Sequence, residues 1–121
     1  MSALAWIAVG LLGGVAAAAR FLLDAEIGAR AKGEFPLGIF VVNVSGAFAL
    51  GLVAGLALDG AALTIVAGGG IGSFTTFSTW ILDSHRLGAA GKASLAWLNL
   101  GLSLAAGLAA VTLGHWLGGL L

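Results

Sequence analysis

The sequence predicts an all-α membrane protein with four transmembrane helices, and three observations support this fold class. Of the 121 residues, 60% are hydrophobic and only 8% are charged, whereas a soluble domain carries roughly 25% charged residues. The charged residues gather in clusters that separate four long runs without any Asp, Glu, Lys or Arg. No run alternates between apolar and polar residues with a period of two, which excludes spanning strands.

Each of the four runs is long enough to cross a bilayer, which takes about 20 helical residues. The first is followed by a charged segment that begins at Arg20, and the second opens at Pro36, a residue suited to the first helical position. Asp59-Gly60 indicates a tight turn before the third run, and a charged loop from residue 83 to 92 precedes the fourth. The sequence therefore predicts one transmembrane domain over residues 1–121, with spans of about 4–23, 36–58, 61–82 and 93–118.

Tryptophans and glycines fit this arrangement. Trp6 and Trp116 fall at one predicted membrane face, while Trp80 and Trp97 fall near the other, as expected for an aromatic belt. Some glycines recur four residues apart, a spacing that lets two helix backbones approach closely. The pairs are Gly10/Gly14, Gly51/Gly55 and Gly114/Gly118, but with 21 glycines in the chain such pairs also arise from abundance alone, and no single pair is decisive.

The third run contains the most unusual stretch, GGGIGSFTTFSTW at residues 68–80. A glycine costs about 1 kcal/mol in a helix interior relative to alanine, so the glycines at 68–72 predict a break in the spanning helix there. The alternative is that these glycines only allow close packing against a neighbouring helix. The hydroxyl groups of TTFST can satisfy backbone groups that such a break frees. A broken helix presents uncharged carbonyl and amide groups inside the membrane, where they bind ions. Carbonyl oxygens without charge suit a hard cation such as sodium.

The absence of embedded charge excludes several functions. A proton-coupled exporter needs a titratable group within the membrane, so a small multidrug-type exporter is a weak alternative for a chain without one. The formal net charge is zero, which argues against binding of nucleic acid. His85 lies in a loop and His115 near a membrane edge, with no spacing typical of a nucleophile and base or of a metal site. The chain is therefore predicted not to be an enzyme.

Neutral polar and aromatic residues remain inside the predicted spans. Asn43 and Asn99 either join neighbouring helices or present N–H donors to a small anion, and the residues alone leave both roles open. Phe74, Phe77 and Trp80 are three residues apart and would line one side of a helix. Because an aromatic ring has a positive edge, such a stripe can meet an anion, although core or lipid packing is its usual role.

These motifs resemble those of the small CrcB/Fluc fluoride channels. The stretch at 68–80 is similar to their glycine-rich run followed by TTFSTF or TTFSSF, and VNVSGAF at 42–48 is similar to their second-helix motif. GGVAAAAR ending at Arg20 and NLGLSLAAGLAA starting at Asn99 resemble the ends of the family's first helix and its fourth helix. The resemblance covers nearly the whole chain.

The resemblance implies a passive, fluoride-selective channel that exports cytoplasmic fluoride across the plasma (inner) membrane of a prokaryote. It implies an antiparallel dimer with a structural sodium ion at its interface, held by the backbone carbonyls of Gly72 and Thr75. It places Arg20 in a vestibule and assigns to the anion pore Asn43, Phe77, Trp80, Thr76 or Thr79, Asn99 and Ser103. Trp80 replaces the family's second phenylalanine, so both a pore and a belt position stay open for it. The alternative is a non-conducting four-helix assembly subunit, whose polar groups only join helices.

The basic residues are distributed asymmetrically. With four spans, all five Lys and Arg residues fall on the side of the two longer loops and none on the side of the termini. The positive-inside rule then predicts cytoplasmic loops. A chain that inserts in only this orientation cannot build an antiparallel homodimer. The sequence therefore favours a heterodimer with an oppositely oriented paralogue over a homodimer.

Overall fold

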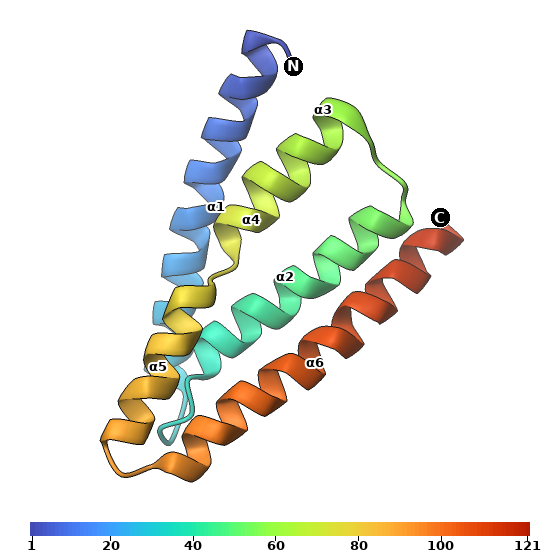
Figure 1. The fold of residues 1–121 in the computed structure, drawn as a ribbon. Coiled ribbons are helices and arrows are strands. Elements are labelled where there is room, and N and C mark those ends of the chain that lie inside the picture. The colour runs from blue at the N-terminus through green and yellow to red at the C-terminus, as the bar shows by residue number, and fades with distance from the viewer.

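The computed structural model describes all of residues 1–121, and all of its regular secondary structure is helical. Four helical segments are long and apolar enough to cross a membrane, and the third of them is interrupted (Figure 1). The predicted fold class, all-helical with four spans and a broken third helix, is confirmed. The elements are α1 (Ala3–Arg30), α2 (Leu37–Gly55), α3 (Gly60–Leu63), η1 (Thr64–Ile71), α4 (Gly72–Phe74), α5 (Phe77–Ala89) and α6 (Ala93–Leu120).

Several helices differ in extent from the expected spans. α1 begins after Ser2, whose hydroxyl accepts a hydrogen bond from Ala5 N at 3.1 Å, and it continues through the charged segment to Arg30. Arg30 pairs with Glu26 at 2.7 Å, an i,i+4 pair that supports this last helical turn. α5 similarly continues past Asp83 to Ala89. The charged residues therefore do not end these helices.

The chain ends and loops are divided between the two ends of the bundle. Both termini and the turn between α2 and α3 lie at one end, and the α1–α2 and α5–α6 loops lie at the other (Figure 1). Lys92 of the second loop pairs with Glu34 of the first, which links the two loops. Four of the five basic residues lie in these loops or in the last turns of the helices that enter them, and Arg20 lies within α1, ten residues before its end.

Glycines set the distance between α2 and α6, which pack along most of their length. A Cβ atom added to Gly51 would overlap the Val111 carbonyl oxygen, and Cβ atoms on Gly55, Gly114 and Gly118 would likewise meet backbone atoms of the opposite helix. Only residues without a side chain permit this approach. Two of the three glycine pairs noted in the sequence thus lie where two helix backbones approach closely.

The third predicted pair does not form a helix contact within the chain. No atom lies within 4 Å of the Cβ positions of Gly10 and Gly14. α1 instead uses Gly13, whose Cβ position lies 3.0 Å from Ser73 Oγ and 3.3 Å from Gly69 O. The contact of α1 with the third span therefore lies on a neighbouring face of the helix.

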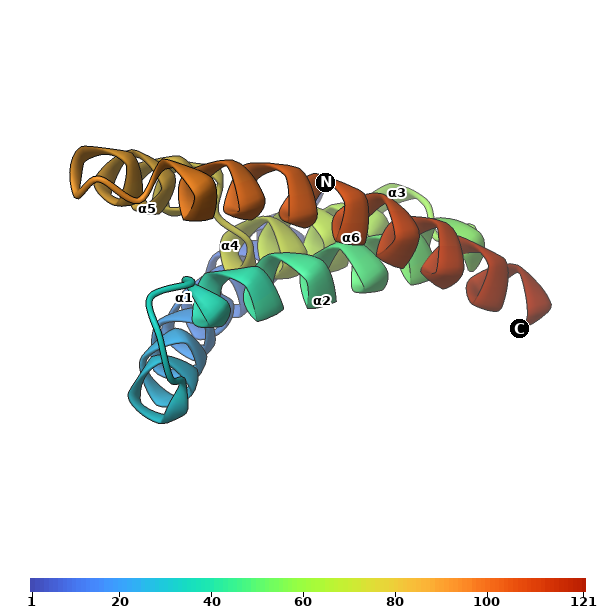
Figure 2. The same ribbon diagram turned by 90° about the horizontal axis from the view of Figure 1, so that it is seen from below.

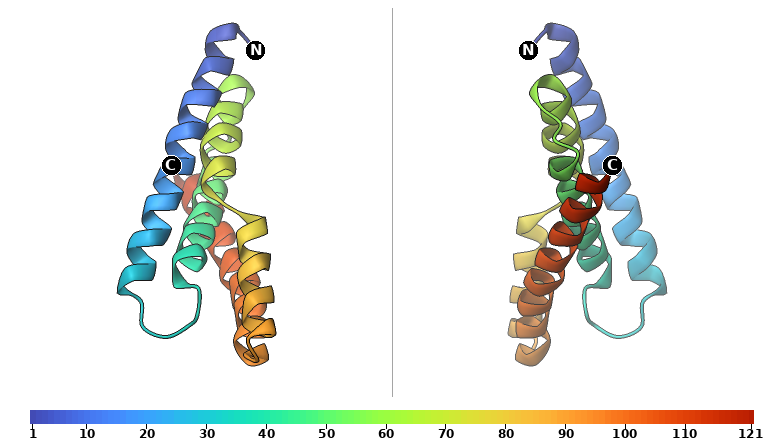
Figure 3. Two further views of the ribbon diagram at one scale, coloured as in Figure 1. Left: turned by 90° about the vertical axis from the view of Figure 1, so that its left-hand side faces the viewer. Right: turned by 90° about the vertical axis from the view of Figure 1, so that its right-hand side faces the viewer.

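The two halves of the third span pack against different helices (Figures 2 and 3). The first half, which comprises α3, η1 and α4, lies against α1, whereas α5 lies against α6. The two halves join at Thr75 and Thr76, whose backbones are extended with ψ of 159° and 124°. At this point the third span stops packing against α1 and begins to pack against α6.

The break lies after the glycine run 68–72 and not within it, which corrects the sequence-based expectation. The glycines stay helical in the wider π-helix η1 and the short α4. Gly69 is buried, and its Cβ position lies 3.0 Å from Val9 O and 3.1 Å from Val9 Cα of α1. Packing against α1 thus compensates for the low helix propensity of glycine. The interruption falls instead where side chains replace helical hydrogen bonds.

Candidate functional site

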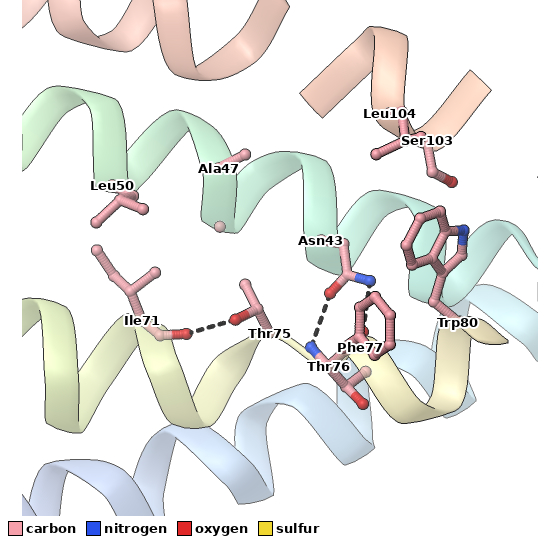
Figure 4. A pocket seen from close by; sticks show the side chains of 11 residues that line it. Asn43, Ala47, Leu50, Ile71, Thr75, Thr76, Phe77, Trp80, Ser103 and Leu104 are labelled. Carbon is pink, nitrogen blue, oxygen red and sulfur yellow. Dashed lines mark hydrogen bonds between the residues drawn. The ribbon is translucent and has the colours of Figure 1, made fainter. Parts of the chain in front are cut away.

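Asn43 of α2 holds the broken segment through two hydrogen bonds to one residue (Figure 4). Its Oδ1 accepts from Thr76 N at 2.8 Å, and its Nδ2 donates to Thr76 O at 2.8 Å. The amide side chain therefore occupies the place of a peptide group and satisfies both backbone groups of Thr76. An amide nitrogen carries two hydrogens, so one N–H of Asn43 remains beyond this pair of bonds.

Hydroxyl groups complete the break on both sides. Thr75 Oγ1 donates to Ile71 O at 3.0 Å, at the end of the first half. Thr76 Oγ1 accepts from Thr79 N at 3.2 Å and lies 3.0 Å from Thr79 Oγ1, so Thr76 caps the N-terminus of α5. The hydroxyl side chains thus satisfy backbone groups at the break, as the sequence predicted.

The break leaves the carbonyls of residues 72–75 without their helical donors, and Gly72 O and Thr75 O are two of these four. In an unbroken helix, Gly72 O would accept from Thr76 N, and Thr75 O would accept from Thr79 N. Here Thr76 N donates to Asn43 and Thr79 N donates to the Thr76 hydroxyl. The carbonyls of Gly72 and Thr75 are therefore free of these bonds, and they are the two that the resemblance assigns to sodium.

A cavity of about 320 Å³ lies beside the break, between α2, α5 and α6. It brings together six residues that the sequence assigned to the anion pore or the sodium site, and Figure 4 shows their side chains. No charged side chain lines it. These six residues are Asn43, Thr75, Thr76, Phe77, Trp80 and Ser103, and the other lining residues are Gly46, Ala47, Leu50, Ile71 and Leu104.

The two aromatic residues of the cavity form an edge-to-face pair. The ring centroids of Phe77 and Trp80 are 5.5 Å apart, with an interplanar angle of 77°. Phe77 is 72% exposed, whereas Trp80 is half-buried and donates its Nε1 hydrogen to Asn99 O at 3.2 Å. The other tryptophans are much more exposed, at 58% for Trp6, 73% for Trp97 and 60% for Trp116. Trp80 thus differs in its surroundings from the three belt tryptophans.

Asn99 lies outside this cavity, in the interface of α5 and α6. Its side chain is almost fully buried, at 1% exposed. Its Nδ2 donates to Ser84 Oγ at 2.8 Å, and its Oδ1 accepts a longer bond from Ser103 Oγ at 3.4 Å. Ser84 Oγ in turn donates to Trp80 O at 2.9 Å. The sequence analysis did not single out Ser84, because it lies beyond the expected end of the third span, although its i,i+4 spacing from Trp80 was a usable signal.

Three further predicted residues also lie outside the lining of the cavity. Thr79 is bonded to Thr76, and Gly72 precedes the break. Arg20 makes no hydrogen bond or ion pair in the chain, and its Nε is buried without a partner. The guanidinium group is therefore not neutralised by a carboxylate of its own chain.

Most of the chain matches a known family. The model described as "CrcB-like protein, Camphor Resistance (CrcB)" matches residues 7–115. The chain belongs to the CrcB family. The resemblance of its glycine, hydroxyl and aromatic motifs is thereby confirmed. CrcB membership also agrees with a multi-pass membrane protein of a prokaryotic ion channel family, and with the prediction that the chain is not an enzyme.

Individual CrcB relatives match over most of their length. The chain is 43% identical over 112 residues to the "Fluoride-specific ion channel FluC 2" of Mycobacterium tuberculosis, covering 93% of this chain and 89% of the relative. Two relatives come from Symbiobacterium thermophilum. The one named FluC 1 is 41% identical, covering 95% of this chain and 98% of the relative, and the one named FluC 2 is 44% identical, covering 85% and 88%.

Proposed function

We propose that the chain is a subunit of a passive, fluoride-selective channel that exports cytoplasmic fluoride. The observation that carries this proposal is the uncharged cavity, where amide, hydroxyl and ring-edge groups converge beside a broken helix. Relatives that are named fluoride-specific ion channels, and that match over nearly the whole chain, support the choice of anion.

The cavity offers the chemistry that a small anion needs when it leaves water. The second N–H of Asn43 is a neutral donor, and the edges of Phe77 and Trp80 carry partial positive charge. The Thr76 and Ser103 hydroxyls donate to Thr79 Oγ1 and Asn99 Oδ1 in this structure, and each would rotate to donate to an anion instead. Neutral groups of this kind replace the hydration shell without trapping the ion as a fixed positive charge would. Hydrogen fluoride crosses membranes in its neutral form and dissociates in the cytoplasm, so a passive pore releases the trapped anion down its gradient.

A second subunit completes the site in this proposal. Phe77 is 72% exposed in the single chain, so one side of the aromatic pair is uncovered. An antiparallel partner would cover that side, and two subunits would place their broken helices together. The carbonyls of Gly72 and Thr75, free of their helical donors, fit a sodium ion at this interface. A sodium ion bound there would supply positive charge beside the two breaks and would lower the cost of anion entry.

We further propose that the partner is an oppositely oriented paralogue. All five Lys and Arg residues lie toward the loop end, and none lies toward the termini. The occurrence of two relatives in Symbiobacterium thermophilum is consistent with paired chains in one organism. Reporter fusions at the C-terminus test the orientation, because a single external population supports the heterodimer and equal populations on both sides contradict it.

A growth experiment tests the function itself. A bacterium that lacks its fluoride exporters is grown on fluoride with this gene, with a candidate paralogue gene, or with both. Growth that needs both genes supports the channel and the heterodimer. A lack of growth under every combination, with both proteins present in the membrane, favours the non-conducting assembly subunit instead.

A further inference from the structure

We propose that the Trp80 indole N–H is a structural donor and not an anion donor, and that Ser84 positions Trp80 so that its ring edge alone faces the cavity. The inference rests on the proposed anion pathway and goes beyond it, because it assigns the two ends of one side chain to different tasks. It concerns a residue that stands where the family resemblance places a phenylalanine.

The geometry commits the indole N–H to the protein. Trp80 Nε1 donates to the backbone carbonyl of Asn99 at 3.2 Å, across the interface of α5 and α6. The ring nitrogen lies on the side of the indole away from Asn43, and the six-membered ring lies toward the cavity (Figure 4). Since the indole has only this one N–H, no polar donor of Trp80 remains for an anion.

The hydrogen bond from Trp80 Nε1 to Asn99 O is here called the tether. Ser84 contacts both of its residues, through the carbonyl of Trp80 and the side chain of Asn99. Its hydroxyl donates to Trp80 O at 2.9 Å and accepts from Asn99 Nδ2 at 2.8 Å. The Ser84 hydroxyl thus contacts both the backbone of Trp80 and the side chain of Asn99. A shift of α5 against α6 would break the two bonds that cross the interface, Trp80 Nε1 to Asn99 O and Asn99 Nδ2 to Ser84 Oγ, together.

Because Asn99 is buried, its side-chain amide depends on the Ser84 hydroxyl as a hydrogen-bond acceptor. Ser84 is 6% exposed and Asn99 is 1% exposed, so little water can reach either polar group. A buried amide that loses its acceptor must find another one or shift toward water. Removal of the hydroxyl therefore loosens the anchor at Asn99, and the position of the Trp80 ring becomes less well defined.

This arrangement explains how a tryptophan can serve where a phenylalanine is expected. The indole is larger and polar, and a free N–H beside the cavity would hold an anion more strongly than a C–H edge does. Bonding of the N–H to Asn99 O removes this donor and leaves an apolar edge next to Phe77, with which it makes the edge-to-face contact. The tether thus makes Trp80 behave toward the anion as an unsubstituted ring.

Indole ¹⁵N NMR of the full chain, assembled with its partner in a detergent micelle, tests the proposal. The chain has four tryptophans, and selective labelling of this chain with loss of one signal in Trp80→Phe identifies the Trp80 signal. We expect this signal to be the same in fluoride and in chloride at equal ionic strength, and its hydrogen to exchange with deuterium more slowly than those of the three exposed tryptophans. A fluoride-dependent shift of the Trp80 signal would overturn the proposal.

The role of Ser84 is tested with matched variants. In Ser84→Ala, we expect hydrogen exchange at the Trp80 indole to become about fivefold faster, the population change that corresponds to the net free energy of one hydrogen bond. Fluoride efflux per channel should fall by a similar factor, and Ser84→Thr, which keeps the hydroxyl, should restore both. Ser45→Ala is the control, because Ser45 bonds only to Val42 O of its own helix at 3.0 Å.

Unchanged exchange in Ser84→Ala would contradict the positioning role. The exchange measurement does not require conduction. If the unmodified assembly fails to pass fluoride, the proposed function falls, and the exchange rates still decide whether the tether exists. If Ser84→Ala does not assemble, the fluoride titration of the unmodified chain still decides whether the Trp80 N–H contacts the anion.

Discussion

The two halves of the third spanning helix are held in place by different forces. The first half packs against α1 through glycines, and none of its side chains donates a hydrogen bond to another helix. The second half is joined to α2 and α6 by hydrogen bonds that involve Asn43, Trp80, Ser84 and Asn99. Close apolar packing fixes a distance between helices, whereas hydrogen bonds fix an orientation.

The half of the third span that is held by hydrogen bonds is also the half that borders the proposed anion pathway. The cavity residues of the third span lie mainly at the break and on the second half, where ring edges and donors must keep one orientation. The first half supplies a firm support and the carbonyls of the break. Substitutions that disturb orientation should therefore affect conduction, and substitutions that disturb packing should mainly affect stability.

The largest effect is expected for Asn43→Asp. A carboxylate places a negative charge beside the anion, and two like charges about 4 Å apart repel by about 4 kcal/mol at an effective dielectric constant of about 20. The variant also loses the donor to Thr76 O. We expect fluoride efflux from liposomes to fall roughly a thousandfold. Efflux within a few fold of the parent would show that Asn43 does not face the ion.

A packing defect is expected for Gly69→Val in the first half. The Cβ position of Gly69 already lies 3.0 Å from Val9 O, so the larger side chain would push η1 from α1 and lower the free energy of unfolding by about 2 kcal/mol. Gly68→Val is the matched control, because the nearest atom to its Cβ position is Thr64 Cγ2 at 3.9 Å. Thermal melting in detergent compares the two, and equal melting temperatures would refute the glycine contact.

A smaller effect is expected for Thr76→Ala, which removes the N-cap of α5. Loss of a capping hydroxyl costs about 1 kcal/mol, and Thr76→Ser should retain the cap. Thr79→Val removes only the hydroxyl that Thr76 Oγ1 contacts at 3.0 Å, and it leaves Thr79 N in place. If Thr79→Val slows fluoride efflux more than Thr76→Ala does, the pore hydroxyl belongs to Thr79 and the assignment to Thr76 is wrong.

The smallest effect is expected for Thr64→Ala. The Thr64 hydroxyl is exposed and bonds at 3.2 Å only to Gly60 O of its own helical turn. We expect a change in the free energy of unfolding within about 0.5 kcal/mol and no change in efflux. A marked loss of conduction would mean that hydroxyls of the first half also orient the pathway.

The sequence predicted the parts of this arrangement that depend on local pattern. Charge-free runs indicated the four spans. Glycines at a spacing of four suggested close helix contacts in general, but they did not indicate that α2 packs on α6. The position of the break could not be read in the same way. The glycine run stays helical because it packs on Val9, and the interruption depends on Asn43, which is 33 residues away from Thr76 in the sequence.

The tether of Trp80 was missed for a similar reason. Its acceptor lies on α6, 19 residues further along the chain, and the register between α5 and α6 decides whether the two residues meet. Helical spacing alone places Phe77 and Trp80 on one face, but it does not indicate which end of the indole faces the neighbouring helix. The cavity could be anticipated by residue type, whereas the orientation of its side chains required the packed structure.

Fluoride efflux from liposomes that contain the purified chain with its oppositely oriented partner tests the central claim most directly. The proposal predicts that fluoride leaves the vesicles while chloride stays inside, because neutral donors and ring edges replace the hydration shell of the smaller anion. Vesicles that hold fluoride as tightly as protein-free vesicles do, although the assembled dimer is present, would contradict it.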